Sequence, residues 1–76
     1  MSDHICYHIR QGIIYGVGKT AEDAIIDARY NARDPDVDTS EWRAIPADAA
    51  LIDRIHAEGG DCNWRIDRNT GIATID

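Results

Sequence analysis

The sequence has no long apolar run, and its first residues are polar. No stretch approaches the roughly 20 consecutive apolar residues that a helix needs to cross a bilayer. The start Met1-Ser2-Asp3-His4 lacks the apolar segment of a signal peptide. We therefore expect a cytoplasmic protein with no membrane partner.

Cysteine is also scarce. Cys6 and Cys62 are the 2 cysteines of the chain, which is too few for a disulfide scaffold. In a reducing compartment both are interpreted as small apolar side chains that are buried or half-buried. A bridge between them stays open as an alternative, provided that their strands are neighbours.

Recognisable catalytic motifs are missing. The chain has no Gly-x-Ser-x-Gly elbow and no His-Glu-x-x-His zinc motif. Gly16-x-Gly18-Lys19-Thr20 resembles the end of a phosphate-binding loop, but that signature requires a glycine where Ile13 stands. We interpret this segment as the exit of a strand followed by a helix N-cap. The sequence therefore predicts no enzyme activity and no cofactor.

The length and composition indicate one small folded domain over residues 1–76. Apolar residues make up 43% of the chain and charged residues 29%, which is typical of globular proteins and too apolar for a disordered one. A chain of this length buries only roughly 60% of the surface that its unfolded form exposes. The core is therefore thin, and it leaves little stability for a strained, deeply buried active site.

Negative charge is concentrated in the middle of the chain. The formal net charge is −6, divided as +1 over residues 1–19, −5 over residues 20–41 and −2 over residues 42–76. The acidic residues of the middle segment are Glu22, Asp23, Asp27, Asp34, Asp36, Asp38 and Glu41. Such a surface repels phosphate backbones and attracts basic proteins, although acidity also keeps small proteins soluble. We expect no direct binding of nucleic acid.

The first half of the chain reads as a hairpin followed by a helix. Apolar residues alternate over 5–10 and 13–17, and the turn between them predicts an antiparallel pair. Thr20 begins a capping box, with acidic residues in the first helical turn. The helix is expected to reach Ala32, because Asp34-Pro35 stops it.

In the second half, the pattern predicts a strand over 41–45 that Pro46 closes, a helix over 47–58 and two strands over 62–66 and 72–75. The element order is therefore β-β-α-β-α-β-β. It predicts a two-layer α+β fold, with both helices on one face of a mostly antiparallel sheet. The other face would carry His4, Cys6, His8 and Arg10.

The expected first helix has one unusual feature. Its alanine-rich side is suited to close packing against a sheet, whereas Ile26 and Tyr30 fall on the opposite side among carboxylates. An apolar and aromatic centre with a charged rim is typical of a protein interface. We predict that this surface binds a partner, unless the following loop covers Ile26. Its predicted residues are Glu22, Asp23, Ile26, Asp27, Tyr30, Asp34, Asp36 and Asp38.

A metal site is a further hypothesis, because His4, Cys6 and His8 share one face of the first strand. Residues two apart on a strand are about 6.6 Å apart, so at most two of them and one from elsewhere, such as Cys62, can share one zinc. A plain polar face is the alternative, and we assign no metal ligands.

Two stretches resemble known families. Gly16-Val17-Gly18-Lys19-Thr20-Ala21-Glu22-Asp23-Ala24 is similar to the strand-to-helix junction of HicB-type antitoxins. Residues 51–64 and 71–74, with the N-terminal hairpin and helix, are similar to small phage and prophage proteins. In size, charge and layout the chain resembles anti-CRISPR proteins against type I systems. That resemblance implies an acidic α/β domain that binds the RNA-guided surveillance complex and obstructs its DNA-binding surfaces.

Together these features predict an inhibitor that binds a basic, nucleic-acid-handling protein or ribonucleoprotein, with type I CRISPR Cascade as the partner implied by the resemblance. The carboxylates would oppose the lysines and arginines that hold DNA phosphates. An antitoxin-like protein that neutralises a small basic toxin, or a small metal-binding or ligand-binding domain, are the alternatives. The chain is expected to be a monomer, or a homodimer through an uncovered sheet face or an edge strand.

Overall fold

The computed structural model describes residues 3–32 and 39–76. The elements are β1 (Asp3–His8), β2 (Ile14–Gly18), α1 (Ala21–Ala32), a 3-10 turn (Thr39–Glu41), β3 (Trp42–Ala47), α2 (Ala49–Glu58), β4 (Trp64–Ile66) and β5 (Ala73–Ile75). Their order confirms the predicted β-β-α-β-α-β-β arrangement and the α+β class. The five strands form one sheet in the order β2-β1-β3-β5-β4. Only the pairing of β3 with β5 is parallel among the described strands.

The N-terminal hairpin contains a bulge opposite Cys6 and Tyr7 of β1. Cys6 pairs with Gly16 and Tyr7 pairs with Ile14, so Tyr15 is an extra residue in β2. Such a bulge increases the local twist and redirects the extra side chain. Tyr15 consequently stacks on Trp42 at the start of β3, with ring centroids 5.8 Å apart.

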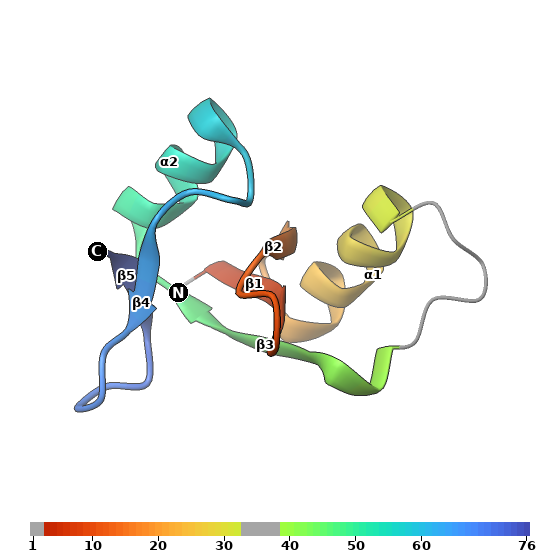
Figure 1. Cartoon of the computed structure of the whole chain (residues 1–76), viewed down its shortest axis with the longest axis horizontal. Coiled ribbons are helices and arrows are strands. Elements are labelled where there is room, and N and C mark those ends of the chain that lie inside the picture. Colours follow the sequence, from red (N-terminus) through yellow and green to blue (C-terminus); the bar gives the residue numbers. More distant parts are fainter. Residues whose placement is uncertain (1–2, 33–38) are drawn as a thin grey trace.

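The two helices cover opposite faces of the sheet, so their predicted position on one face is wrong. Ile5 packs with Leu51 and Ile52 of α2, whereas the adjacent Cys6 packs with Ala24 and Ala28 of α1. Neighbouring residues of a strand point to opposite faces, and each helix therefore has its own core cluster. In Figure 1, α1 and α2 lie on either side of the β1–β2 hairpin.

A close approach of α1 to the hairpin explains how this second layer fits. A Cβ atom added to Gly16 would lie 2.3 Å from the carbonyl oxygen of Ala24 and 2.4 Å from the amide nitrogen of Ala28. One added to Gly18 would lie 2.6 Å from the amide nitrogen of Ala24. Both glycines are therefore required by packing, and α1 lies directly on the backbone of β2.

Both helices begin at side-chain caps. The hydroxyl of Thr20 accepts a hydrogen bond from the backbone N–H of Asp23 (3.1 Å), which confirms the predicted start of α1. Asp48 caps α2 by accepting from the backbone N–H of Leu51 (2.9 Å), so α2 starts later than predicted. Pro46 lies within β3 and does not end it. In the part of the chain that the structure describes, no helix is long and apolar enough to cross a membrane.

Candidate protein-binding surface

The exposed side of α1 carries two large apolar residues one turn apart. Ile26 is 58% exposed and Tyr30 is 77% exposed, which confirms the predicted orientation of the helix. Glu22 lies one turn before Ile26 and is also exposed. We call Glu22, Ile26 and Tyr30 the α1 ridge. The ridge points away from the sheet because the opposite side of α1, with Ala24 and Ala28, is fully buried.

The predicted carboxylates of this surface differ in their surroundings. Glu22 and Asp23 are exposed in the first turn of α1. Asp27 is half-buried, and its Oδ2 accepts hydrogen bonds from the backbone N–H of Val17 (2.9 Å) and from the side chain of Asn31 (3.4 Å). Asp27 therefore braces α1 against β2 and is not part of the ridge. Asp34, Asp36 and Asp38 lie outside the described residues.

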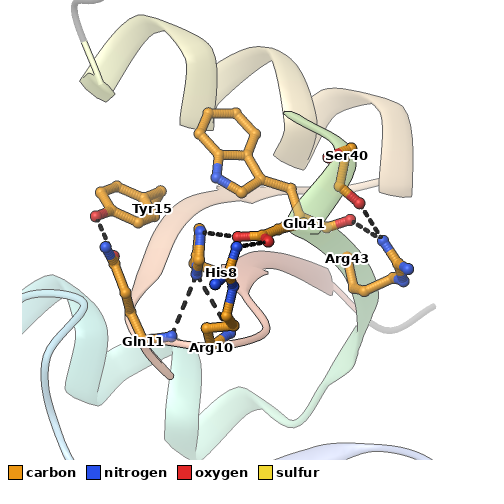
Figure 2. A network of polar contacts seen from close by, with 8 residues as sticks. His8, Arg10, Gln11, Tyr15, Ser40, Glu41 and Arg43 are labelled. Atoms are coloured by element: carbon orange, nitrogen blue, oxygen red, sulfur yellow. Dashed lines mark hydrogen bonds and ion pairs between the residues drawn. The ribbon is translucent and has the colours of Figure 1, made fainter. Parts of the chain in front are cut away.

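Glu41, which adds to the negative charge of the middle segment, is engaged within the chain. One carboxylate oxygen lies 3.0 Å from Nε2 of His8, and the other contacts the guanidinium of Arg10. Figure 2 shows these contacts beside the stacked ring of Tyr15, whose hydroxyl donates to Gln11 (2.7 Å). The network ties the start of β3 to the end of β1.

Both ring nitrogens of His8 are occupied. Nδ1 accepts hydrogen bonds from the backbone N–H groups of Arg10 and Gln11, each at 3.2 Å, and Nε2 faces Glu41. A histidine that acts as a general base needs one nitrogen directed at a substrate proton. In this structure both nitrogens of His8 therefore serve contacts within the chain.

The described residues do not form the metal site that the alternation of the first strand allowed. Cys6 is completely buried against α1, and burial raises the pKa of its thiol to about 11. No group of three or more His, Cys, Asp or Glu side chains in the described segments is placed to hold a metal ion. The face that carries His4, Cys6 and His8 is the one that α1 covers, so it is not an uncovered polar face.

The possible bridge between the two cysteines is also ruled out in this fold. Cys6 belongs to the core cluster beneath α1, and Cys62 packs against the cluster beneath α2. Both thiols are free. They therefore lie on opposite sides of the sheet, where a disulfide cannot form without moving the backbone.

The outer edge of β2 is a feature that sequence reasoning missed. Asp27 accepts from Val17, the side-chain amide of Asn31 donates to the backbone oxygen of Tyr15 (2.7 Å), and the backbone oxygen of Gly60 accepts from the N–H of Ile14 (2.8 Å). These contacts occupy groups with which another strand would pair. The sequence feature that could have predicted this covered edge is the spacing of Asp27 and Asn31. They are four residues apart, on the flank of the helix that faces the hairpin.

No family model, curated protein or solved structure matches this chain.

Proposed function

We propose that this protein is an inhibitor that works by binding a basic surface of a nucleic-acid-handling complex, and that the α1 ridge is its contact surface. The observation that supports the proposal most is the exposure of Ile26 and Tyr30 on a helix whose other side is fully packed. A small protein gains no stability from leaving two such side chains in water. They are well placed, however, to be buried by a partner.

The ridge has the properties of an interface centre. Tyrosine supplies a large contact area and loses little conformational entropy when it becomes ordered, and isoleucine fills an apolar pocket. Because α1 is anchored on β2 through Gly16 and Asp27, the ridge is held rigidly before binding. Pre-ordering of this kind lowers the entropic cost of association.

The negative charge of the protein also supports a basic partner. Asp27 and Glu41 are used inside the chain, so among the described residues the charge close to the ridge comes from Glu22 and Asp23, with the exposed Arg29 on the same helix. The net charge of −6 acts over a longer range and speeds the approach of a positively charged surface. In this account the ridge supplies most of the affinity, and the charge supplies attraction and orientation.

The partner is proposed from the resemblance to anti-CRISPR proteins. A type I surveillance complex holds DNA phosphates with lysines and arginines, and an acidic protein seated on them would obstruct DNA binding. The proposed action is therefore occlusion by binding, with no catalytic step.

A capture experiment combined with phage plating tests the proposal. The tagged protein is expressed in a host with an active type I system, and the wild type should capture the complex and restore plating of a targeted phage. The Ile26→Ser/Tyr30→Ser variant should lose both effects and stay folded. Ile9→Ser is a matched control, because Ile9 is 46% exposed and lies outside α1. Capture by the double variant at the wild-type level would exclude the ridge as the contact surface.

The antitoxin-like alternative is tested in the same host background. The protein is co-expressed with the genes that neighbour its own, and growth is measured. Rescue from an adjacent toxin, without any effect on phage plating, would replace the proposed inhibitor of a surveillance complex with an antitoxin.

A further inference from the structure

A pocket lies beside the β2 edge, between α1 and the C-terminal end of α2. Its walls are formed by Ile14, Tyr15, Gly16 and Val17 of β2, Asp27 and Asn31 of α1, and Ile55, His56, Gly59 and Gly60 at the end of α2. The pocket is separate from the α1 ridge, because the ridge lies on another side of α1. The elements that line it come from both halves of the chain, so it exists only in the folded protein.

The electrostatics of this pocket favour a cation. Asp27 supplies a carboxylate, and it is the only acidic side chain among the described residues of the wall. The other end is formed by the last turn of α2, which carries the negative end of the helix dipole. No lysine or arginine belongs to the described lining, and His56 is its remaining titratable side chain apart from Tyr15.

The walls also fit an alkyl chain. Val17 and Ile55 contribute apolar surface between the two polar ends. Lysine and arginine side chains combine an apolar stem with a charged head. They therefore suit a pocket with apolar walls and negative charge at the Asp27 carboxylate and at the end of α2. Asp27 uses Oδ2 for Val17 and Asn31, and a carboxylate has further lone pairs with which to accept from a guanidinium.

We propose that this pocket binds an arginine side chain of a protein partner. The choice of occupant rests on the proposed function, which requires a basic partner, and on the match between charge and walls. Arginine is favoured over lysine because its planar guanidinium is weakly hydrated and donates in several directions at once. The partner would thus be held at the α1 ridge and, around the flank of the same helix, by one inserted side chain.

Nuclear magnetic resonance on the isolated protein tests this assignment without any partner. The probe is N-acetyl-arginine methylamide, and the readout is the shift of the backbone amides of Val17 and Gly60. The citrulline analogue, which has the same shape without the charge, and the lysine analogue serve as comparisons. We expect saturable shifts in the millimolar range with arginine, weaker binding of lysine, and none with citrulline. Equal shifts with arginine and citrulline would overturn the proposal.

Charge variants show whether Asp27 is responsible. Asp27→Asn keeps an oxygen that can accept from Val17 and should weaken arginine binding about fivefold or more. Asp53→Asn, an equal charge loss at an exposed site of α2 outside the pocket, should leave binding unchanged. His56→Glu adds a carboxylate at the rim without touching the brace, and it should tighten binding.

These variants also separate the two proposals. Arginine binding that is the same in the wild type, Asp27→Asn and His56→Glu would overturn the pocket assignment but leave the α1 ridge untouched. Loss of capture by the ridge variant with normal arginine binding is the result expected if both proposals hold. Normal arginine binding with no capture by the wild type would contradict the proposed function alone.

Discussion

Cys6 is part of the apolar core, although its thiol is an ionisable group. Its side chain is fully buried, and this burial raises the pKa of the thiol from 9.0 to about 11. In the unfolded chain the thiol regains the lower value. Between about pH 9 and pH 11 the unfolded state therefore loses a proton that the folded state keeps, and the free energy of unfolding decreases as the pH rises.

The prediction is that the wild type loses stability over this range faster than Cys6→Ala. Denaturant unfolding of both proteins is compared at several pH values from about 8 to about 11. Below about pH 9 the difference between them reflects packing alone and should be constant. A difference that stays constant up to pH 11 would contradict the assigned pKa.

Gly16 sets the distance between α1 and β2. A methyl group there would meet backbone atoms of Ala24 and Ala28, which cannot move aside as a side chain would. Gly16→Ala is expected to lower the free energy of unfolding by about 3 kcal/mol, measured by urea denaturation. Gly12→Ala is the comparison, because Gly12 has a φ of +69° but no atom within 4 Å of the added Cβ. It should cost about 1 kcal/mol, and equal losses would argue against close packing of α1.

At the scale of elements, α1 acts as a brace for the edge strand β2. The carboxylate of Asp27 and the amide of Asn31 replace the acceptor and donor that a neighbouring strand would offer. This pairing protects the edge against addition of another strand, including one from a second copy of the chain. It leaves the exposed side of the same helix, with Ile26 and Tyr30, free for contacts of another kind.

Hydrogen exchange checks this brace. Asp27→Ala should speed exchange of the Val17 amide roughly fivefold to tenfold, because that N–H loses its acceptor. The control is Asp53→Ala, which removes the same charge from an exposed site of α2. If both variants exchange at the wild-type rate at Val17, the brace does not stabilise the edge.

Local signals predicted the elements better than their ends. The hydroxyl of Thr20 and the acidic first turn were sufficient to predict where α1 begins. The helical period was sufficient to predict that Ile26 and Tyr30 are exposed. Pro46 was misleading because the β3 register continues through it to Ala47. The hydrogen bond of Asp27 to β2 was missed because a carboxylate on the flank of a helix is predicted to face solvent unless the position of the neighbouring strand is known.

For the whole molecule, the sequence was sufficient for the class and the order of elements but not for the faces that the helices cover. Cys6 between His4 and His8 reads as part of a polar face, whereas the structure buries it beneath α1. The signal that was overlooked is Gly16 and Gly18 on β2, since side chains are missing where a helix approaches closely. Because Gly16 and Gly18 alternate with Val17, they mark a second face of β2 on which a helix can pack closely.

Net charge is also a property of the whole molecule, and it leads to a prediction about rates. With a net charge of −6, association with a basic partner should slow markedly as salt rises from about 50 mM to about 500 mM. Dissociation should change much less, because the contacts proposed for the α1 ridge are apolar. Surface plasmon resonance with the captured complex separates the two rates. An association rate that does not depend on salt would show that charge attraction has no part in binding.

The α1 ridge is proposed as the contact surface of an inhibitor. The most direct test is the dissociation constant between a purified type I surveillance complex and the protein, measured for the wild type and for Ile26→Ser/Tyr30→Ser. We predict tight binding by the wild type and a loss of about 100-fold or more in the variant, with its unfolding midpoint nearly unchanged. Equal dissociation constants for the two proteins would contradict it.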